Sequence, residues 1–318
     1  MALHQLAATP ETVRIGMFDA SFPPVLSIDP GDTVVIETVS GWRQHLPPAD
    51  SGIAIPPALN RIIAADLPRM AGHTITGPVE VVGAEPGDML EVRIEAVELG
   101  SDWGYTFIRP LDGALPEEFP ETVITRTPID RARGLAKLPW GLDLPTAPFF
   151  GVMGVAPPVA FGRISSKEPR VHGGNIDNKE LTAGSTLFLP VHVAGALFSA
   201  GDGHGLQGDG EVCVTALETC LTGRFTLILH KGGGLQNPRL RFPRAETPTH
   251  FISMGMNEDL DQAMKQALRE MLSLICSRTN LSREEAYQFC SLAVDFRVTQ
   301  VVNGHKGVHG MLRKGLLF

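Results

Sequence analysis

The segment Gly201–Glu211 holds the densest set of residues in this chain that could bind a metal ion or move a proton. It reads Gly-Asp-Gly-His-Gly-Leu-Gln-Gly-Asp-Gly-Glu, which places the acids Asp202, Asp209 and Glu211 beside His204. Glycine reaches positive φ at little cost, so we expect a loop that folds back sharply and turns these side chains toward one point. Carboxylates held so close together repel one another unless a cation lies between them. The segment therefore predicts a divalent metal site and, as a second hypothesis, hydrolysis by a metal-bound water.

Two simpler interpretations of the same segment stay open. The acids could be solvated in a glycine-rich turn, or they could hold a structural calcium ion, because alternating Asp and Gly with a closing Glu is typical of calcium loops. The spacing differs from that of an EF-hand, and His204 is a poor calcium ligand. Zinc is therefore the preferred ion and calcium the alternative. An extended backbone would place Asp202 and His204 on one face, and likewise Asp209 and Glu211.

A second glycine-rich stretch, His172–Asn178, could complete the site. It supplies one more carboxylate, Asp177, which we predict to be a metal ligand, and a second imidazole, His172, which could line the site or be a hydrogen-bonded loop histidine. His73, in the turn before a predicted strand, is a secondary candidate for lining the site. Cys213 lies two positions after Glu211 and could act as a nucleophile beside it. A buried structural cysteine is the more common occupant of such an apolar run.

The composition limits the partners that this protein can have. The chain has 318 residues and a net charge of −8, with no long run of Lys or Arg, which argues against nucleic acid and anionic membranes as partners. The N-terminus lacks the pattern of a signal peptide, and no apolar run reaches membrane-spanning length. The four cysteines show no CxxC pair. We therefore expect a soluble cytoplasmic protein with reduced thiols.

The pattern of the chain predicts a mainly β fold. Its 34 glycines and 25 prolines separate short apolar runs, and residues 89–96 alternate between apolar and charged side chains. We expect either a β-sandwich of the jelly-roll type or a barrel, with a small α+β element near the C-terminus. Residues 100–150 read as long loops with few short elements. A hairpin is predicted between residues 212–220 and 224–230, with its turn at 221–223.

The carboxyl-terminal region changes to a helical period. Helices are predicted at 257–276, with Asn257 as N-cap, and at 282–293, where Ser282 and Glu285 form a capping box; a late strand follows at 298–302. We divide the chain into a β-rich part, 1–165, and a part with the metal loops and helices, 166–318, within one compact unit. The apolar helix and the closing residues 316–318 favour a homodimer or a larger homo-oligomer.

Nine phrases, in a consistent order, resemble the acetamidase/formamidase family. They are Ile75–Pro78, Gly83–Asp88, His172–Asn178, Leu189–Val191, Gly195–Ser199, Gly201–His204, Gln207–Val212, Asp259–Asp261 and Leu281–Ala286. The resemblance implies a β-dominated fold, hydrolysis of non-peptide C–N amide bonds in small amides, and a divalent metal at the Asp/His loops. Members similar to this family also include lactam hydrolases. The length of the chain resembles that of the shorter, acetamidase-like members, whereas residues 42–45 and 100–150 match no family pattern and leave the substrate open.

These observations predict an amidase in which Asp177, Asp202, His204 and Asp209 hold one or two zinc-like ions. Glu211 is the candidate general base, which takes a proton from water and passes it to the departing nitrogen. The role of Glu211 could be exchanged with that of a ligand. Two other classes remain open: a cysteine-nucleophile amidase that uses Cys213, and a non-catalytic metal-binding β module.

Overall fold

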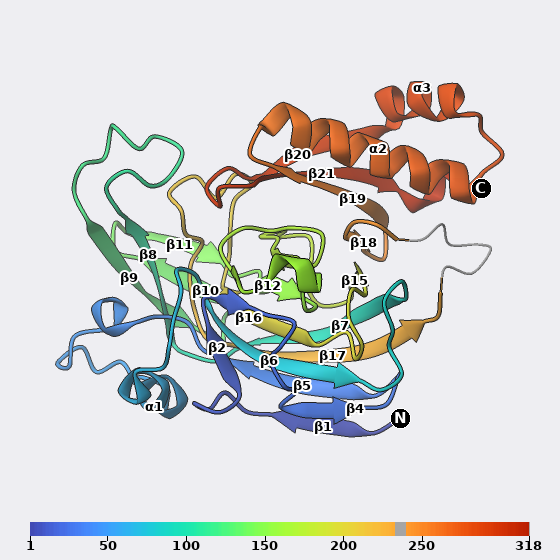
Figure 1. Ribbon diagram of the computed structural model, residues 1–318. Helices are drawn as coiled ribbons and strands as arrows, with labels where there is room; N and C mark the ends of the chain where they lie inside the picture. The colour runs from blue at the N-terminus through green and yellow to red at the C-terminus, as the bar shows by residue number, and fades with distance from the viewer. Residues whose placement is uncertain (233–239, 318) are drawn as a thin grey trace.

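The largest element of the fold is a nine-stranded sheet that runs through the whole molecule (Figure 1). The computed structural model describes residues 1–232 and 240–317, so Phe318 of the apolar tail lies outside the described residues. The spatial order of the sheet is β1 (Leu3–Leu6), β5 (Thr33–Thr38), β17 (Leu221–His230), β7 (Met89–Leu99), β15 (Thr186–Pro190), β18 (Arg244–Glu246), β19 (His250–Asn257), β21 (Lys306–Arg313) and β20 (Val294–Gln300). Strands from residues 1–165 and from residues 166–318 are interleaved in this order.

A second sheet, of six strands, carries two of the residues predicted to do chemistry, Asp202 and His204, on its strand β16 (Phe198–His204). The order of this sheet is β14 (Gly173–Asn175), β12 (Phe149–Gly154), β16, β6 (Thr74–Val81) and β2 (Val13–Ile15), with β4 (Leu26–Ile28) also paired to β6. The two sheets share one apolar core, in which the rings of Phe150 and Phe198 pack 5.3 and 5.7 Å from the ring of Phe225 on the larger sheet. This layering confirms the predicted mainly β sandwich, and none of the sheets in the described chain closes into a barrel.

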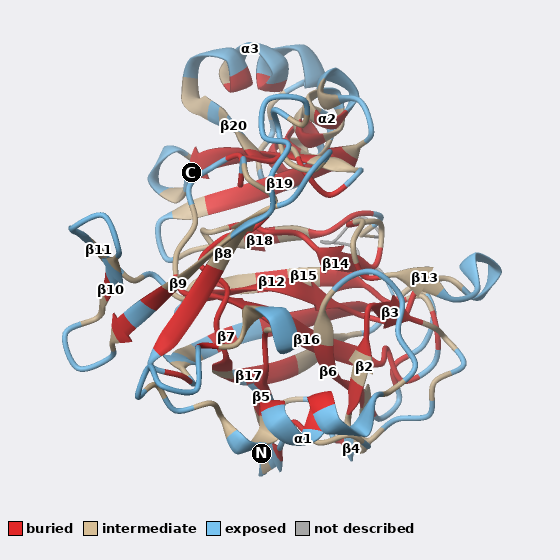
Figure 2. Cartoon of the chain, turned by 90° about the vertical axis from the view of Figure 1, so that its left-hand side faces the viewer, coloured by how far each residue is buried: buried red, intermediate tan, exposed pale blue. Residues whose placement is uncertain are grey.

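The alternation predicted for β7 is present. Leu90, Val92 and Ile94 are buried in the core between the sheets, while Arg93 is exposed. Glu91 is buried as well, because this central strand pairs with β17 and places the Glu91 carboxylate against His230 and Arg93. Figure 2 shows how far burial extends along the strands of the central layers, whereas the outer faces of the helices are exposed.

Residues 100–150, predicted to be mostly loop, instead form a four-stranded sheet. It contains β8 (Trp103–Ile108), β9 (Val123–Asp130), β10 (Leu135–Leu138) and β11 (Leu142–Pro145), joined by antiparallel pairings. β10 and β11 are short, and every residue of β11 is at least partly exposed. They therefore lack the buried alternation by which a strand is recognised in a sequence. A short pair, β3 (Met17–Phe18) with β13 (Ile164–Ser165), and the helix α1 (Pro57–Ala65) complete the N-terminal half.

Two glycine-containing stretches predicted as turns lie inside strands. Gly201 and Gly203 belong to β16, where a Cβ atom would come 2.4 Å from the carbonyl oxygens of Thr74 and Thr219 respectively. Gly223, predicted to be in a hairpin turn, lies within β17, where the rings of Phe150 and Phe225 occupy the space of a side chain. Residues 212–220 form no strand of the predicted hairpin. These glycines permit close approach of neighbouring chain rather than a reversal of direction.

The two predicted helices are present near the C-terminus. α2 (Leu260–Arg278) is capped by Asp259, not Asn257, since Oδ1 of Asp259 accepts a hydrogen bond from the Gln262 amide at 2.9 Å. α3 (Arg283–Ala293) has the predicted capping box between Ser282 and Glu285. The late strand, β20, begins directly after α3, earlier than predicted. None of the described helices is long and apolar enough to cross a bilayer.

Candidate active site

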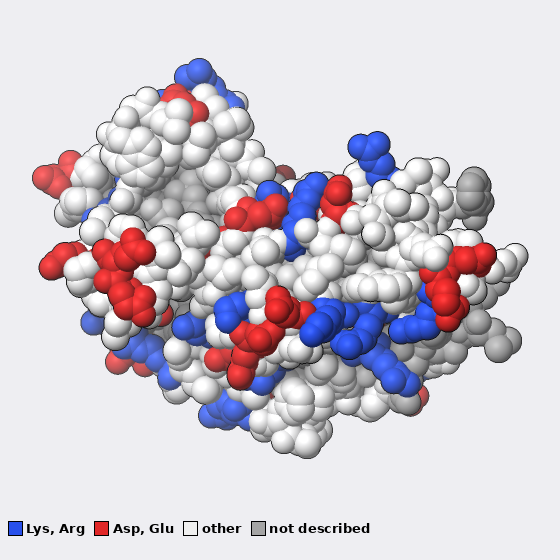
Figure 3. Space-filling model, turned by 90° about the horizontal axis from the view of Figure 1, so that it is seen from above, with Lys and Arg blue, Asp and Glu red and all other residues white. Residues whose placement is uncertain are grey.

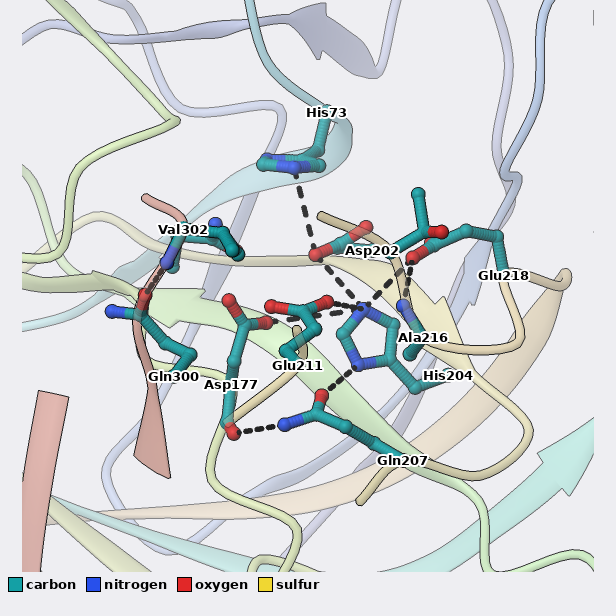
Figure 4. Close-up of polar contacts among 12 residues, drawn as sticks. His73, Asp177, Asp202, His204, Gln207, Glu211, Ala216, Glu218, Gln300 and Val302 are labelled. Atoms are coloured by element: carbon teal, nitrogen blue, oxygen red, sulfur yellow. Dashed lines mark hydrogen bonds and ion pairs between the residues drawn. The ribbon is translucent and has the colours of Figure 1, made fainter. Parts of the chain in front are cut away.

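Four carboxylates and one imidazole converge at the end of β16 (Figure 4). The Nε2 atom of His204 lies 3.2 Å from Asp202 Oδ2, 3.4 Å from Glu218 Oε1, 3.8 Å from Asp177 Oδ1 and 4.0 Å from Glu211 Oε1. All five side chains are buried. They form two overlapping sets of three metal-ligand groups, Asp177 with His204 and Glu211, and Asp202 with His204 and Glu218. Since Nε2 of His204 has one lone pair, a single ion can use it at a time.

The backbone at this cluster is unusual. Asp177, Asp202 and Glu211 have φ values of +49°, +57° and +45°, in the left-handed region that L-residues with side chains seldom adopt. Each such residue costs on the order of 1 to 3 kcal/mol and persists where the surrounding structure imposes it. Three strained acids that point at one imidazole indicate that the geometry of the cluster is maintained at the expense of stability, which is common at functional sites.

Gln207 fixes the protonation of the His204 ring. Its Nε2 donates to the carbonyl oxygen of Asp177 at 2.9 Å, which leaves its Oε1 to face Nδ1 of His204 at 3.0 Å. An amide oxygen can only accept, so Nδ1 carries a proton, and Nε2 is the ring nitrogen that is left to face the carboxylates. This is the arrangement by which proteins orient a metal-binding histidine.

Two further residues hold the acids in place. Nδ2 of Asn303, in the turn between β20 and β21, donates to Oδ2 of Asp177. The Asn303 turn is itself ordered by Gln300, whose Oε1 accepts from the amides of Val302 and Asn303. The Nε2 atom of His73 lies 3.7 Å from Asp202 Oδ2, so this secondary candidate is at the site.

The residues of the cluster fit a metal ion. Asp177 Oδ1, His204 Nε2 and Glu211 Oε2 are buried and have no hydrogen-bond partner among the described residues. The space between them is kept open by Gly151 of β12, where a Cβ atom would come 2.4 Å from Asp177 Oδ1, 2.5 Å from Asp202 Oδ2 and 2.7 Å from His204 Cε1. Carboxylate oxygens and one imidazole are suitable ligands for a divalent ion.

The electrostatics of the cluster favour a positive counter-charge. Burial raises the pKa of Asp177 to about 6, and the Asp202 charge acts in the same direction, whereas His204 opposes it. Burial also raises the pKa of Glu211 and of Glu218 well above the usual range, with Asp177 and Asp202, respectively, as the main neighbouring charges. Burial opposes protonation of His204, yet the Glu218 and Asp202 charges raise its pKa well above the ordinary value. A divalent cation can replace the protons that such a group would otherwise hold.

The structure brings together some predicted residues and not others. Asp177, Asp202, His204 and Glu211 converge as predicted. Asp209 lies outside both sets of three: it is exposed, and its Oδ2 pairs with Lys179 Nζ at 2.9 Å. It turns away because the chain reaches the surface at Gly208 and Asp209 and returns to the interior at Gly210 and Glu211.

His172 and Cys213 are also placed away from the cluster. His172 is fully buried and packs edge-on against Phe18, with ring centroids 4.9 Å apart. Cys213 is half-buried, and its Sγ faces the carbonyl oxygen of Thr215 at 3.6 Å.

Sequence reasoning missed Glu218, Gln207, Asn303 and Gly151. Gln207 lies within a phrase that resembles the family, so it could have been singled out. Glu218 follows an apolar run with no glycine or histidine beside it, and Asn303 and Gly151 lie far along the chain from the metal loops. Only the pairing of strands brings these three to the site.

A cavity of about 540 Å³ leads to the cluster. Asp202, Glu211 and Glu218 line its inner end, together with Asn303, whereas Asp177 and His204 lie behind them. The carboxylates are therefore open to a substrate that enters the cavity, and the imidazole is shielded from it.

The sequence profile of the acetamidase/formamidase family matches residues 9–168 and 162–308. The chain belongs to this family. It is similar in structure to the acetamidase of Bacillus halodurans, with a TM-score of 0.82 and 32% identity over 98% of each chain. It is also 28% identical over 303 residues to the formamidase of Methylophilus methylotrophus, a match that covers 77% of this chain and 72% of the formamidase. The chain is also 30% identical to a formamidase predicted in Schizosaccharomyces pombe. That match covers 58% of this chain and 56%, little more than half, of the formamidase.

Proposed function

We propose that this protein hydrolyses the C–N bond of small amides with the help of one divalent metal ion, zinc in preference to calcium. The observation that carries the proposal is the buried group of four carboxylates around Nε2 of His204, at the inner end of a cavity. Membership of the acetamidase/formamidase family supports the reaction class. The full-length similarity to an acetamidase supports the same reaction class. An imidazole ligand suits zinc better than calcium.

We assign the metal ligands to Asp177, Asp202 and His204, that is, one acid from each of the two sets and the imidazole that both sets share. These three surround the space that Gly151 leaves free. When bound, a divalent ion would polarise the amide carbonyl and lower the pKa of a water molecule that it binds. Asn303 and Gln207 would keep Asp177 and His204 in position: Asn303 donates to Oδ2 of Asp177, and Gln207 accepts from Nδ1 of His204, which leaves the other polar atom of each side chain for the ion.

Glu211 is our candidate for the proton transfers. It faces the cavity, and its Oε2 has no hydrogen-bond partner among the described residues. Glu211 would accept a proton from the attacking water and deliver it to the amide nitrogen, which leaves poorly unless it is protonated. The C–O bond forms, the C–N bond breaks, and the products are a carboxylate and ammonia or an amine. Glu218, which lies on the other side of His204, could exchange roles with Glu211.

Two measurements on the purified protein test this proposal. Elemental analysis should find a divalent metal bound to the chain, and a panel of small amides and lactams should release ammonia or show ring opening. In the Glu211→Gln variant we expect the metal to be retained and turnover to fall by a factor of about 100 or more. Loss of metal from that variant would make Glu211 a ligand. Tight metal binding by the wild-type protein without turnover of any amide would instead support a non-catalytic binding module.

The cysteine-nucleophile alternative has a separate test. Cys213 does not line the cavity, although its neighbours Val214 and Thr215 do. We expect Cys213→Ala to keep full activity, and loss of activity in this variant would reinstate the thiol as nucleophile.

A further inference from the structure

The cavity is much larger than the amides after which the family is named. Acetamide has four non-hydrogen atoms and occupies on the order of 100 Å³, at about 30 Å³ for each water-sized group. The cavity measures about 540 Å³, within the range of sites that enclose ligands of several rings. Small amides would leave most of this space to water, so the dimensions indicate a larger substrate.

One wall of the cavity is built from stacked flat rings. The His45 ring lies parallel to the rings of Tyr105 and Phe107, with centroids 4.4 and 5.4 Å away and interplanar angles of 19° and 12°. Burial lowers the pKa of His45 to about 4, so its ring is neutral at pH 7. Trp42 lines the same cavity. A wall of this kind favours a planar, apolar group in the substrate, because aromatic surfaces stack on one another.

The cavity also has a cation without an ionic partner. Arg69 lines it and lies over the Trp42 ring, with Cζ 4.6 Å from the ring centroid. Two other cations on the lining, Arg109 and Lys167, both face the carboxylate of Asp112. Within the part of the chain that the structure describes, Arg69 has no carboxylate at ion-pair distance, and it is exposed to solvent.

Buried acids and one exposed arginine therefore present opposite charges to the same cavity. The inner end presents the carboxylates of Asp202, Glu211 and Glu218, which repel an anionic group. Arg69, by contrast, attracts one and can bind a carboxylate through two parallel hydrogen bonds. An amide that bears a carboxylate at its opposite end would enter with the amide directed toward the acids and the carboxylate held at Arg69.

We propose that the substrates of this enzyme are amides of planar, apolar groups that carry a carboxylate distal to the amide, and that Arg69 binds this carboxylate. The inference rests on the proposed amidase function and names the substrate class of the same site. Hydrolysis of such a primary amide consumes one water, breaks the C–N bond, and yields a dicarboxylate and ammonia.

A series of benzamides tests the inference. We compare para-carbamoylbenzoate with para-acetylbenzamide, its neutral counterpart of similar size, and with benzamide and acetamide, and measure ammonia release. We expect kcat/KM for para-carbamoylbenzoate to exceed that for para-acetylbenzamide by at least about 10-fold, the effect of one charge-assisted contact. Acetamide as the best substrate, or equal rates for the charged and neutral benzamides, would overturn the proposal.

A pair of arginine variants assigns the effect to one residue. In Arg69→Gln the preference for the charged benzamide should fall to near unity. Arg43→Gln is the matched control, since Arg43 also lies beside the Trp42 ring, at 5.9 Å, but does not line the cavity. It should retain the preference. An unchanged preference in Arg69→Gln, or an equal loss in both variants, would refute the role of Arg69.

Binding measurements separate this inference from the proposed function. Calorimetry on Glu211→Gln, with and without Arg69→Gln, reports the affinity for para-carbamoylbenzoate without turnover. If the protein binds para-carbamoylbenzoate through Arg69 but hydrolyses no amide, the proposed ligand class stands and the proposed amidase function is wrong. If the protein hydrolyses acetamide but shows no Arg69-dependent binding, the amidase function stands and the proposed ligand class is wrong.

Discussion

Asp202 and His204 are two residues apart on β16, and Oδ2 of Asp202 lies 3.2 Å from Nε2 of His204. In a strand, residues i and i+2 face the same side of the sheet, which explains why they meet. Asp202 nevertheless has φ of +57°, so the strand is distorted at the acid whose carboxylate lies nearest to Nε2 of the imidazole. The site therefore combines a regular pairing with a strained backbone.

The strain at Asp202 predicts opposite effects of substitution on stability and on metal binding. Glycine adopts positive φ readily, so Asp202→Gly should be about 1 kcal/mol more stable than Asp202→Ala in urea unfolding with a chelator present. Both variants should also lose metal affinity, because each removes a proposed ligand. With metal added, the wild type should become the most stable of the three. Equal stability of the Gly and Ala variants would show that the backbone at 202 is not strained.

Gly151 should be essential for metal binding although it has no ligand atom. Gly151→Ala places a methyl group between Asp177, Asp202 and His204, so we expect loss of bound metal and of activity while the fold is kept. Elemental analysis and circular dichroism check this. Gly208→Ala is the control, because its Cβ would meet no atom within 4 Å. A fully metallated Gly151→Ala protein would place the ion elsewhere.

Gln207 should act through His204 as a positioning residue. Removal of its side chain in Gln207→Ala frees the imidazole to carry its proton on either nitrogen, and we expect metal affinity to fall by about 10- to 100-fold. Gln207→Glu keeps an acceptor for Nδ1 but loses the donor to Asp177, so its affinity should lie between those of Gln207→Ala and the wild type. Metal titration with a competing chelator measures both. Affinity unchanged in Gln207→Ala would contradict the role.

Burial of His172 should make stability depend on pH. Burial lowers the pKa of His172 to about 3 from the ordinary 6.5, so below pH 6.5 the unfolded chain binds a proton that the folded chain does not. The contribution of His172 to stability is therefore complete above pH 6.5 and is lost as the pH falls toward 3, with a slope of at most about 1.4 kcal/mol per pH unit. The slope for His172→Phe should be shallower by up to that amount. If the stability of the two proteins changed equally with pH, folding would not lower the pKa of His172.

The distribution of charge on the surface agrees with the composition of the chain. Acidic and basic side chains are intermixed over the face drawn in Figure 3, with Lys and Arg beside Asp and Glu in several places. A net charge of −8 is thus reached without a separate basic face on that side of the molecule.

The sequence by itself predicted four of the five side chains that converge in the cluster. The acids and the histidine that glycines separate in 201–211 indicated Asp202, His204 and Glu211, and the glycine-rich stretch 172–178 indicated Asp177. Such groups are rarely buried together unless they bind something. The apolar alternation at 89–96 likewise predicted the strand β7, and the helical period near the C-terminus predicted α2 and α3. Both patterns are local in the sequence.

Only the tertiary structure decided how these groups meet and which others join them. Glu218 reaches His204 because its backbone pairs with both Tyr105 and His204, and Gly151 opens the space for an ion because β12 pairs with β16 in this register. The exclusion of Asp209 follows from a surface turn and a lysine 30 residues earlier in the sequence. Strand register is fixed by the packing of the whole core, so no pattern within a few residues of these positions could have specified it.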